Sequence, residues 1–304
     1  MYIYLPVAEI SVDVLALLAL GGAVGVLSGL FGIGGGFLLT PLLIFLGVPP
    51  AVAVATGANQ VVGASVSGLV AHWRRRNVDI RMGVVLLVGG FLGSSAGVAL
   101  FAWLEKRGHI DVVVGLAYVA LLGLVGGMMA AESLSTLRKG GLPTAVPRKR
   151  HRHPYPSLPL KMRFPQSGLY LSALMPLGVG AFGGLLSAMM GVGGGFVMVP
   201  LMIYVLEMPT SVVVGTSLFQ IIFVTANVTF LHATTTHSVD AVLMLTLLAG
   251  GVIGAQLGAR MATRLKAEQL RLLLALLVLA VCGRLLLGLM LTPDSVFQLD
   301  AAVK

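Results

Sequence analysis

The sequence predicts an all-α polytopic membrane protein with two inverted-topology repeats of about five segments each, whose broken or re-entrant helices meet near the membrane midplane. Three observations predict this class: the composition, a duplicated glycine motif and the placement of Lys and Arg. Of the 304 residues, 57% are hydrophobic and 10% are charged, which is typical of chains with many membrane-spanning helices. The net charge of +9 lies in short clusters between apolar runs, so it indicates membrane topology and not a nucleic-acid partner.

The glycine motif occurs as Gly32-Ile33-Gly34-Gly35-Gly36 and as Gly191-Val192-Gly193-Gly194-Gly195. Glycine is unfavourable inside a helix, so we expect each helical run to break there and to begin again at Phe37 or Phe196. Backbone exposed by a break at membrane depth must face protein or a water-filled cavity, and the new half-helix directs N–H groups and its positive dipole end there. The motif therefore favours an anion site, with close helix packing as the alternative.

The apolar runs give five segments in each half. They lie at residues 14–31, 37–46, 51–71, 82–103 and 112–130, and then at 169–190, 196–206, 211–231, 241–261 and 270–290. At about 1.5 Å per residue, the runs at 37–46 and 196–206 are too short to cross a hydrocarbon core of about 30 Å. We therefore expect the first two segments of each half to form a broken or re-entrant hairpin.

The halves align with one another at an offset of about 160 residues, which is an internal duplication. The matched residues include Ser28 with Ser187, Pro41 with Pro200, Thr56 with Thr216, Gln60 with Gln220, His72 with His232, Asp79 with Asp240, Gly89-Gly90 with Gly250-Gly251, Gly93 with Gly254 and Gly97 with Gly258. We divide the chain into a first transmembrane repeat (1–131), a basic, Pro-rich linker (132–165) and a second transmembrane repeat (166–304).

The linker shows no helical or strand period, so we expect a flexible connector. Its histidines, His151 and His153, have no Cys or acidic neighbours and predict no metal site. The linker also holds eight of the 20 Lys and Arg residues, which places it on the cytoplasmic side. The segment 74–81 carries four Arg, whereas its equivalent, 233–240, carries no Lys or Arg. The repeats are therefore predicted to run in opposite senses, with both termini periplasmic, as in many secondary transporters.

An oxyanion site needs several hydrogen-bond donors and a modest positive potential, which half-helix N-termini supply. On the following helices, Thr and a Gln or Asn recur at a spacing of three or four residues and so share one face. The predicted substrate-binding residues are Gly34, Gly35, Gly36, Thr56, Asn59, Gln60, Gly193, Gly194, Gly195, Thr216, Ser217 and Gln220. A hydrogen bond to a neighbouring helix is the alternative for each polar side chain.

Four further residues, matched between the repeats, are candidates for gating or a proton relay, with capping or anchoring as the alternative. They are His72, His232, Asp79 and Asp240. Arg284 lies within the last segment, where a cation must face protein, water or a partner, and a structural role is favoured over anion attraction. The apolar runs contain no paired carboxylates, activated nucleophile or metal ligands, so we expect no enzyme, metal or cofactor.

These motifs together resemble the TauE/SafE membrane proteins, the sulfite exporter or toluene-sulfonate uptake permease family. The resemblance covers nearly the whole chain and rests on residues 32–37 with Pro41, 191–196 with Pro200, 215–218 and 71–79. It implies a transporter of sulfite or organosulfonates in the bacterial inner membrane, with a small anion and the lipid bilayer as partners; a homodimer is compatible with it. The first repeat departs from the second, because Asn59 offers an amide where Ser217 offers a hydroxyl.

The sequence thus predicts a secondary transporter that exports sulfite or a related small sulfur oxyanion by alternating access. Two alternatives stay open at this point. One is proton-coupled uptake of an organosulfonate or small carboxylate. The other is a membrane scaffold without transport activity, although a scaffold does not need two matched sets of broken helices.

Overall fold

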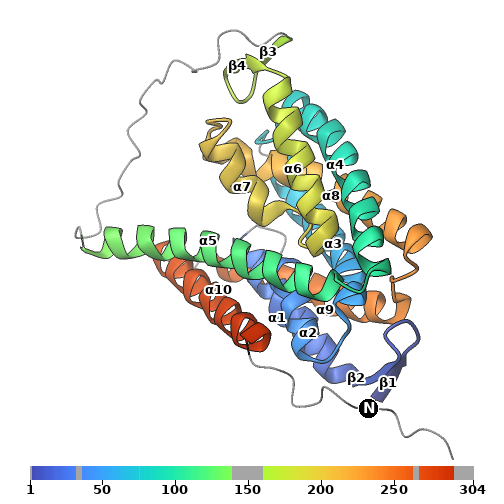
Figure 1. The fold of residues 1–304 in the computed structure, drawn as a ribbon. Helices are drawn as coiled ribbons and strands as arrows, with labels where there is room; N and C mark the ends of the chain where they lie inside the picture. The colour runs from blue at the N-terminus through green and yellow to red at the C-terminus, as the bar shows by residue number, and fades with distance from the viewer. Residues whose placement is uncertain (1, 32–35, 75, 139–159, 263–266, 291–304) are drawn as a thin grey trace, which may run out of the picture.

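A computed structural model of the chain describes residues 2–31, 36–74, 76–138, 160–262 and 267–290 (Figure 1). The first repeat contains β1 (Tyr2–Leu5), β2 (Ile10–Asp13), α1 (Val14–Phe31), α2 (Gly36–Phe45), α3 (Pro50–Arg74), α4 (Ile80–Lys106) and α5 (Ile110–Arg138). The second contains β3 (Lys161–Phe164), β4 (Leu169–Ser172), α6 (Leu174–Met190), α7 (Gly195–Tyr204), α8 (Thr210–Thr235), α9 (Ala241–Ala262) and α10 (Ala267–Met290). The same order of elements therefore occurs twice, and the all-α polytopic class is confirmed.

The helices fall into long and short ones. Within the described residues, five stretches are long and apolar enough to cross a membrane: Ile80–Lys106, Ile110–Ala131, Val212–Thr235, Ala241–Gly258 and Leu273–Met290. In contrast, α2 and α7 have 10 residues each, or about 15 Å of helix. They reach about half of the hydrocarbon core, as their sequences predicted.

The two repeats interlock. Helix α1 packs along α9 and α4 packs along α6, and these two contacts are equivalent, because α1 corresponds to α6 and α9 to α4. Equivalent helices also pair directly, α3 with α8 and α5 with α10 (Figure 1). One buried cluster accordingly includes Leu17 and Tyr118 from the first repeat with Leu243 and Val278 from the second. Among the described residues, each buried cluster draws side chains from both repeats.

Glycines at every fourth position set the close approach in both interlocking contacts. A Cβ atom on Gly93 would lie 1.8 Å from the carbonyl oxygen of Ala181, and one on Gly254 would lie 2.1 Å from that of Gly22. The flanking glycines on α4 (Gly89, Gly97) and α9 (Gly250, Gly258) meet backbone oxygens in the same way. Small residues let the backbones touch, as is common between membrane helices.

Two β-hairpins correct the sequence assignment. The run predicted from residue 169 is wrong at its start, because Leu169–Ser172 is a strand and α6 begins at Leu174. The linker also contains regular structure at both ends, since α5 continues to Arg138 and β3 begins at Lys161. Four-residue strands are too short to show a period in sequence. The remaining linker residues, 139–159, lie outside the described part of the chain.

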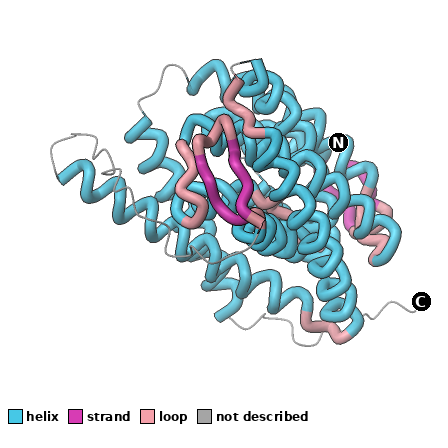
Figure 2. The backbone as a smooth tube through the Cα atoms, turned by 90° about the horizontal axis from the view of Figure 1, so that it is seen from above, coloured by secondary structure: helices cyan, strands magenta, loops and turns pink. Residues whose placement is uncertain are grey.

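The hairpins share one design. Leu5 pairs with Ile10 and Phe164 with Leu169, so each turn has four residues. The hairpins lie at opposite ends of the molecule in Figure 1, and their strands are the magenta parts of the tube in Figure 2. The hairpin is thus part of the duplicated unit, at an end of the helices that differs between the two repeats.

Candidate functional site

The second glycine motif breaks a helix as predicted. Helix α6 ends at Met190, and Gly191, Gly193 and Gly194 have φ angles of 66°, 71° and 77°, a region that side chains with a Cβ disfavour. Helix α7 then begins at Gly195, one residue before the predicted restart. In the first copy α2 begins at Gly36, while Gly34 and Gly35 lie outside the described residues.

The two restarting helices meet each other. The Phe37 and Phe196 rings stack with centroids 4.2 Å apart and planes 10° apart, and each residue is 2% exposed. A Cβ on Gly36 would lie 2.8 Å from the carbonyl oxygen of Val192 in the other motif. Val61 of α3 touches both motifs, since it lies in the space that a Cβ on Gly36 or Gly193 would occupy. The start of α2 and the second glycine motif therefore adjoin at one place in the protein.

The first turn of α7 has donors without acceptors in the helix. Its N-cap, Gly194, has no side chain to cap it, and Val197 N and Met198 N donate to the Gly194 carbonyl at 3.1 and 2.7 Å. Helix geometry leaves the N–H groups of Gly195 and Phe196 without an intrahelical acceptor. Such a turn is suited chemically to an anion.

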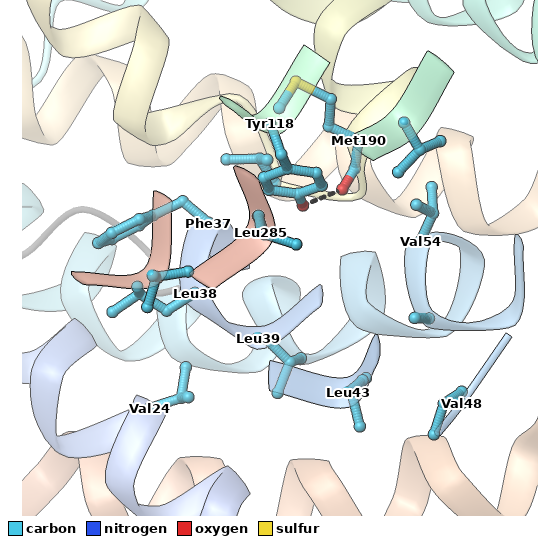
Figure 3. Close-up of a cluster of buried hydrophobic side chains, with 14 of the residues drawn as sticks. Val24, Phe37, Leu38, Leu39, Leu43, Val48, Val54, Tyr118, Met190 and Leu285 are labelled. Carbon is cyan, nitrogen blue, oxygen red and sulfur yellow. Dashed lines mark hydrogen bonds between the residues drawn. The ribbon is translucent and has the colours of Figure 1, made fainter. Parts of the chain in front are cut away.

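Tyr118 contacts the second glycine break, a contact that the sequence did not reveal. It is fully buried on α5, and its hydroxyl donates to the Met190 carbonyl, the last residue of α6 before the glycine break (Figure 3). Leu285 of α10 and Phe37 lie in the same cluster (Figure 3). This bond satisfies a carbonyl that the end of a helix leaves open. Its only signal in the sequence is one hydroxyl within the apolar run 112–130.

Thr56 and Thr216 bind the backbone of the opposite repeat. Thr56 Oγ1 accepts from Asp240 N at 3.1 Å, and Thr216 Oγ1 accepts from Asp79 N at 3.0 Å. Both threonines are fully buried. The matched pair thus makes one contact twice, which holds α3 to the start of α9 and α8 to the start of α4.

The two aspartates cap those helices and hold the hairpins. Asp79, 1% exposed, accepts from Met82 N at 3.2 Å and from Ser167 N and Oγ in the β3–β4 turn at 2.9 and 2.7 Å. Asp240, fully buried, accepts from Leu243 N at 3.0 Å and from Val7 N in the β1–β2 turn at 2.9 Å. These contacts match the capping alternative that the sequence left open, and a gating role for either residue stays a prediction.

The side-chain amides of Gln60 and Gln220, both predicted substrate-binding residues, lie against neighbouring helices. Gln60 Nε2 donates to the Gly21 carbonyl at 3.2 Å and fills the space that a side chain on Gly251 would take. Gln220 lies in the same way against Gly90. The Oε1 atom of each Gln has no hydrogen-bond partner within the described residues. The two amides thus occupy equivalent helix interfaces.

The neighbouring polar residues also have partners. Asn59 Nδ2 donates to Met244 Sδ of α9, and Ser217 Oγ donates to the Val214 carbonyl at 2.9 Å. A substrate-binding role for these residues, and for the threonines and glutamines, stays a prediction.

The remaining candidates are placed as follows. His232 is fully buried, with Nε2 3.1 Å from the Ala188 carbonyl oxygen and its ring edge-on to Phe101 at 4.7 Å. His72 is half-buried near the end of α3. The Arg284 guanidinium lies 5.4 Å from the centre of the Phe45 ring, within cation–π range. No group of three His, Cys, Asp or Glu residues in the described ranges forms a metal site.

Comparison with known proteins adds three findings. The profile of a family described as "Sulfite exporter TauE/SafE" matches residues 17–285. A "Probable membrane transporter protein" of Xylella fastidiosa (strain 9a5c) is 31% identical over 269 residues, which cover 86% of this chain and 90% of the relative. The "Probable membrane transporter protein YjnA" of Bacillus subtilis is 26% identical over 265 residues, 87% of this chain and 96% of the relative. No solved structure gives a significant match.

Proposed function

The chain belongs to the sulfite exporter TauE/SafE family, and from that premise we propose that it exports sulfite or a related small sulfur oxyanion across the inner membrane by alternating access. It is a multi-pass membrane protein and a membrane transporter, in keeping with its relatives. The observation that most directly supports sulfite export by alternating access is the contact between the two half-helices, α2 and α7, where Phe37 stacks on Phe196.

The proposed site is one shared site at this contact. Its donors are the open N–H groups of the first turn of α7, with those of α2 as their counterpart in the first repeat. A helix N-terminus carries about half an elementary charge. That partial charge binds an oxyanion without the tight hold of a full cation, so the anion can be released on the other side. The polar side chains of α3 and α8 add donors in this proposal.

Inverted repeats are supported by where the charges and hairpins lie. Arg74, Arg76 and Arg81 of the α3–α4 connection are exposed, as are Lys161 and Arg163 of β3. The Asp79–Ser167 hydrogen bonds join these two stretches, so the basic residues gather on one side, which we assign to the cytoplasm. The β1–β2 hairpin lies at the other end (Figure 1), and we assign that end to the periplasm.

Alternating access then follows from the interlocked repeats, one of which moves against the other around the shared site. The direction follows from the membrane potential. A potential that is negative inside drives an anion outward by about 2.3 kcal/mol per charge per 100 mV. Export therefore proceeds without an obligatory coupling ion, whereas uptake of an organosulfonate would need co-transported protons.

The test is anion flux in proteoliposomes, with sulfite, sulfate and methanesulfonate supplied separately and with the potential and the pH gradient set independently. We expect sulfite flux that follows the potential and does not need a pH gradient. Flux of a sulfonate that requires a pH gradient would replace export by uptake. Loss of flux in every condition would favour a scaffold.

A glycine variant locates the site. Gly194→Leu forces a side chain into the left-handed backbone at the α7 N-cap, so sulfite flux should be abolished in protein that still reaches the membrane. Gly178 lies on the exposed face of α6 with no atom near its Cβ position, and Gly178→Leu should keep full flux. Normal flux in a folded Gly194→Leu protein would contradict a site at this break.

A further inference from the structure

Four buried hydroxyl groups have no hydrogen-bond partner among the described residues: those of Ser187, Thr40, Ser65 and Thr229. Ser187 is the one beside the second glycine break. It is fully buried on α6, and its Oγ has no hydrogen-bond partner among the described residues. Helical hydroxyls in apolar surroundings usually donate to the carbonyl one turn back, as Thr225 Oγ1 does to Ile221 at 2.6 Å and Thr246 Oγ1 to Val242 at 2.7 Å. The Ser187 hydroxyl does not make this bond, although burial makes an unpaired polar group costly.

Ser187 lies where α6 ends and α7 begins. Its backbone carbonyl accepts from Gly191 N, the left-handed C-cap of α6, at 2.9 Å. The Cβ position of Gly194, the N-cap of α7, lies 3.8 Å from the Ser187 Cβ. The chain thus turns back within the glycine motif and brings the start of α7 beside the last turn of α6. Ser187 therefore lies beside the N-cap of α7, the helix whose first N–H groups, on Gly195 and Phe196, have no acceptor within the helix.

We propose that Ser187 is a substrate-binding residue whose Oγ–H donates to an oxygen of the oxyanion held at the N-terminus of α7. The assignment rests on the proposed function, which it deepens by adding a donor from α6 to the two backbone amides. Three donors from two directions match a ligand with several oxygens on one central atom. Ser28, the equivalent residue on α1, is 7% exposed, so the duplicated chain carries a buried serine at both positions.

The proposal gives Ser187→Ala two effects of opposite sign. Removal of an unpaired buried hydroxyl relieves its burial cost, so the variant without anion should melt at the same temperature as the parent or higher. Removal of a donor to an anion should raise the KM for sulfite by about tenfold or more. The thermal stabilisation produced by added sulfite should shrink accordingly. A residue that only supports the fold would show a lower melting temperature and an unchanged KM.

Ser94 offers a matched control. It is also a fully buried helical serine, but its Oγ donates to the Phe91 carbonyl at 3.2 Å and accepts from Asn227 Nδ2 at 2.9 Å. Ser94→Ala should therefore lower the melting temperature and leave the KM unchanged. Ser187→Cys keeps a weaker donor of similar size and should give a KM between those of the parent and Ser187→Ala.

The measurements are melting of the full-length protein in detergent, with and without sulfite, sulfate or methanesulfonate, and flux in proteoliposomes. Equal protection of the parent and Ser187→Ala by the same anion would overturn the role of Ser187 while the transport function stands. Protection of the parent by an anion other than sulfite, lost in Ser187→Ala, would support Ser187 and overturn sulfite as substrate. If no oxyanion protects the parent, both proposals fail.

Discussion

Gly93→Ala tests the packing that joins the two repeats. The new methyl group would lie 1.8 Å from the Ala181 carbonyl oxygen and 2.6 Å from its carbonyl carbon, whereas ordinary contact begins at 3.4 Å. These are backbone atoms, so no side chain can move aside, and α4 must separate from α6 by roughly 1–2 Å. A gap of that size loses a large part of the dispersion energy along the contact. Overpacking of this kind costs about 1–3 kcal/mol or more, which exceeds the gain of about 1 kcal/mol from replacing a helical glycine.

The assay is the melting temperature of the purified protein in detergent. It is measured from the height of the monodisperse size-exclusion peak that remains after heating. Gly127 is the control, because it lies on the exposed face of α5 and its Cβ position has no neighbour within 4 Å. Gly127→Ala should leave the melting temperature unchanged or raise it. Gly254→Ala, the equivalent on α9, would place its methyl 2.1 Å from the Gly22 carbonyl oxygen and should match the loss seen for Gly93→Ala.

The prediction therefore has three parts. Gly93→Ala and Gly254→Ala should lower the melting temperature by equal amounts, and Gly127→Ala should not lower it. If Gly93→Ala melts like Gly127→Ala, then α4 and α6 do not touch through their backbones and the interlocked arrangement is wrong. If Gly93→Ala and Gly254→Ala differ widely, the two contacts are not equivalent and the duplication does not extend to packing.

Three further predictions follow from the same contacts. Ser167→Ala removes the 2.7 Å hydrogen bond to Asp79 and should cost about 1.5–3 kcal/mol, the range for a bond to a charged partner. Hydrogen exchange in residues 161–172 should rise, and unchanged exchange would show that Asp79 does not hold the β3–β4 hairpin. Thr56→Ala and Thr216→Ala each remove an acceptor for a buried aspartate N–H and should each lower stability by about 1–3 kcal/mol, while Thr→Ser at either position should retain most of it. In a Cys282→Ser background, an impermeant thiol reagent on intact cells should label Thr234→Cys and not Lys161→Cys, because Thr234 is exposed at the end that we assign to the periplasm. The reverse pattern would exclude the proposed orientation.

The helices could be predicted from the sequence because their signals are long. Apolar runs of about 20 residues give α3, α4, α8, α9 and α10 to within a few residues. They also give α5, except that this helix continues beyond the run to Arg138. The break before α7 was predictable for a different reason, since three glycines there adopt φ angles that only glycine favours. In both cases a local preference of the chain coincides with the final fold.

The hairpins and the partners of the polar residues could not be predicted, because they depend on contacts across the duplication. Spacing places Thr56 and Gln60 on one face of a helix, but it does not say that Thr56 meets Asp240 and Gln60 meets Gly21. The same holds for Ser187. The alignment of the repeats pairs it with Ser28, yet its importance lies in an unpaired hydroxyl, which only the surroundings reveal.

Interlocking of the repeats has a consequence for biogenesis. Helix α1 packs along α9, which emerges from the ribosome about 230 residues later, a delay of roughly 10–50 s at about 5–20 residues per second. During that interval α1 contacts only elements of its own repeat, and the Asp240 carboxylate that binds Val7 does not yet exist. The first repeat therefore waits in the bilayer without the main packing partner of α1. Acquisition of the native state is then a single late event, and truncation at the linker should leave a product that membrane quality control degrades.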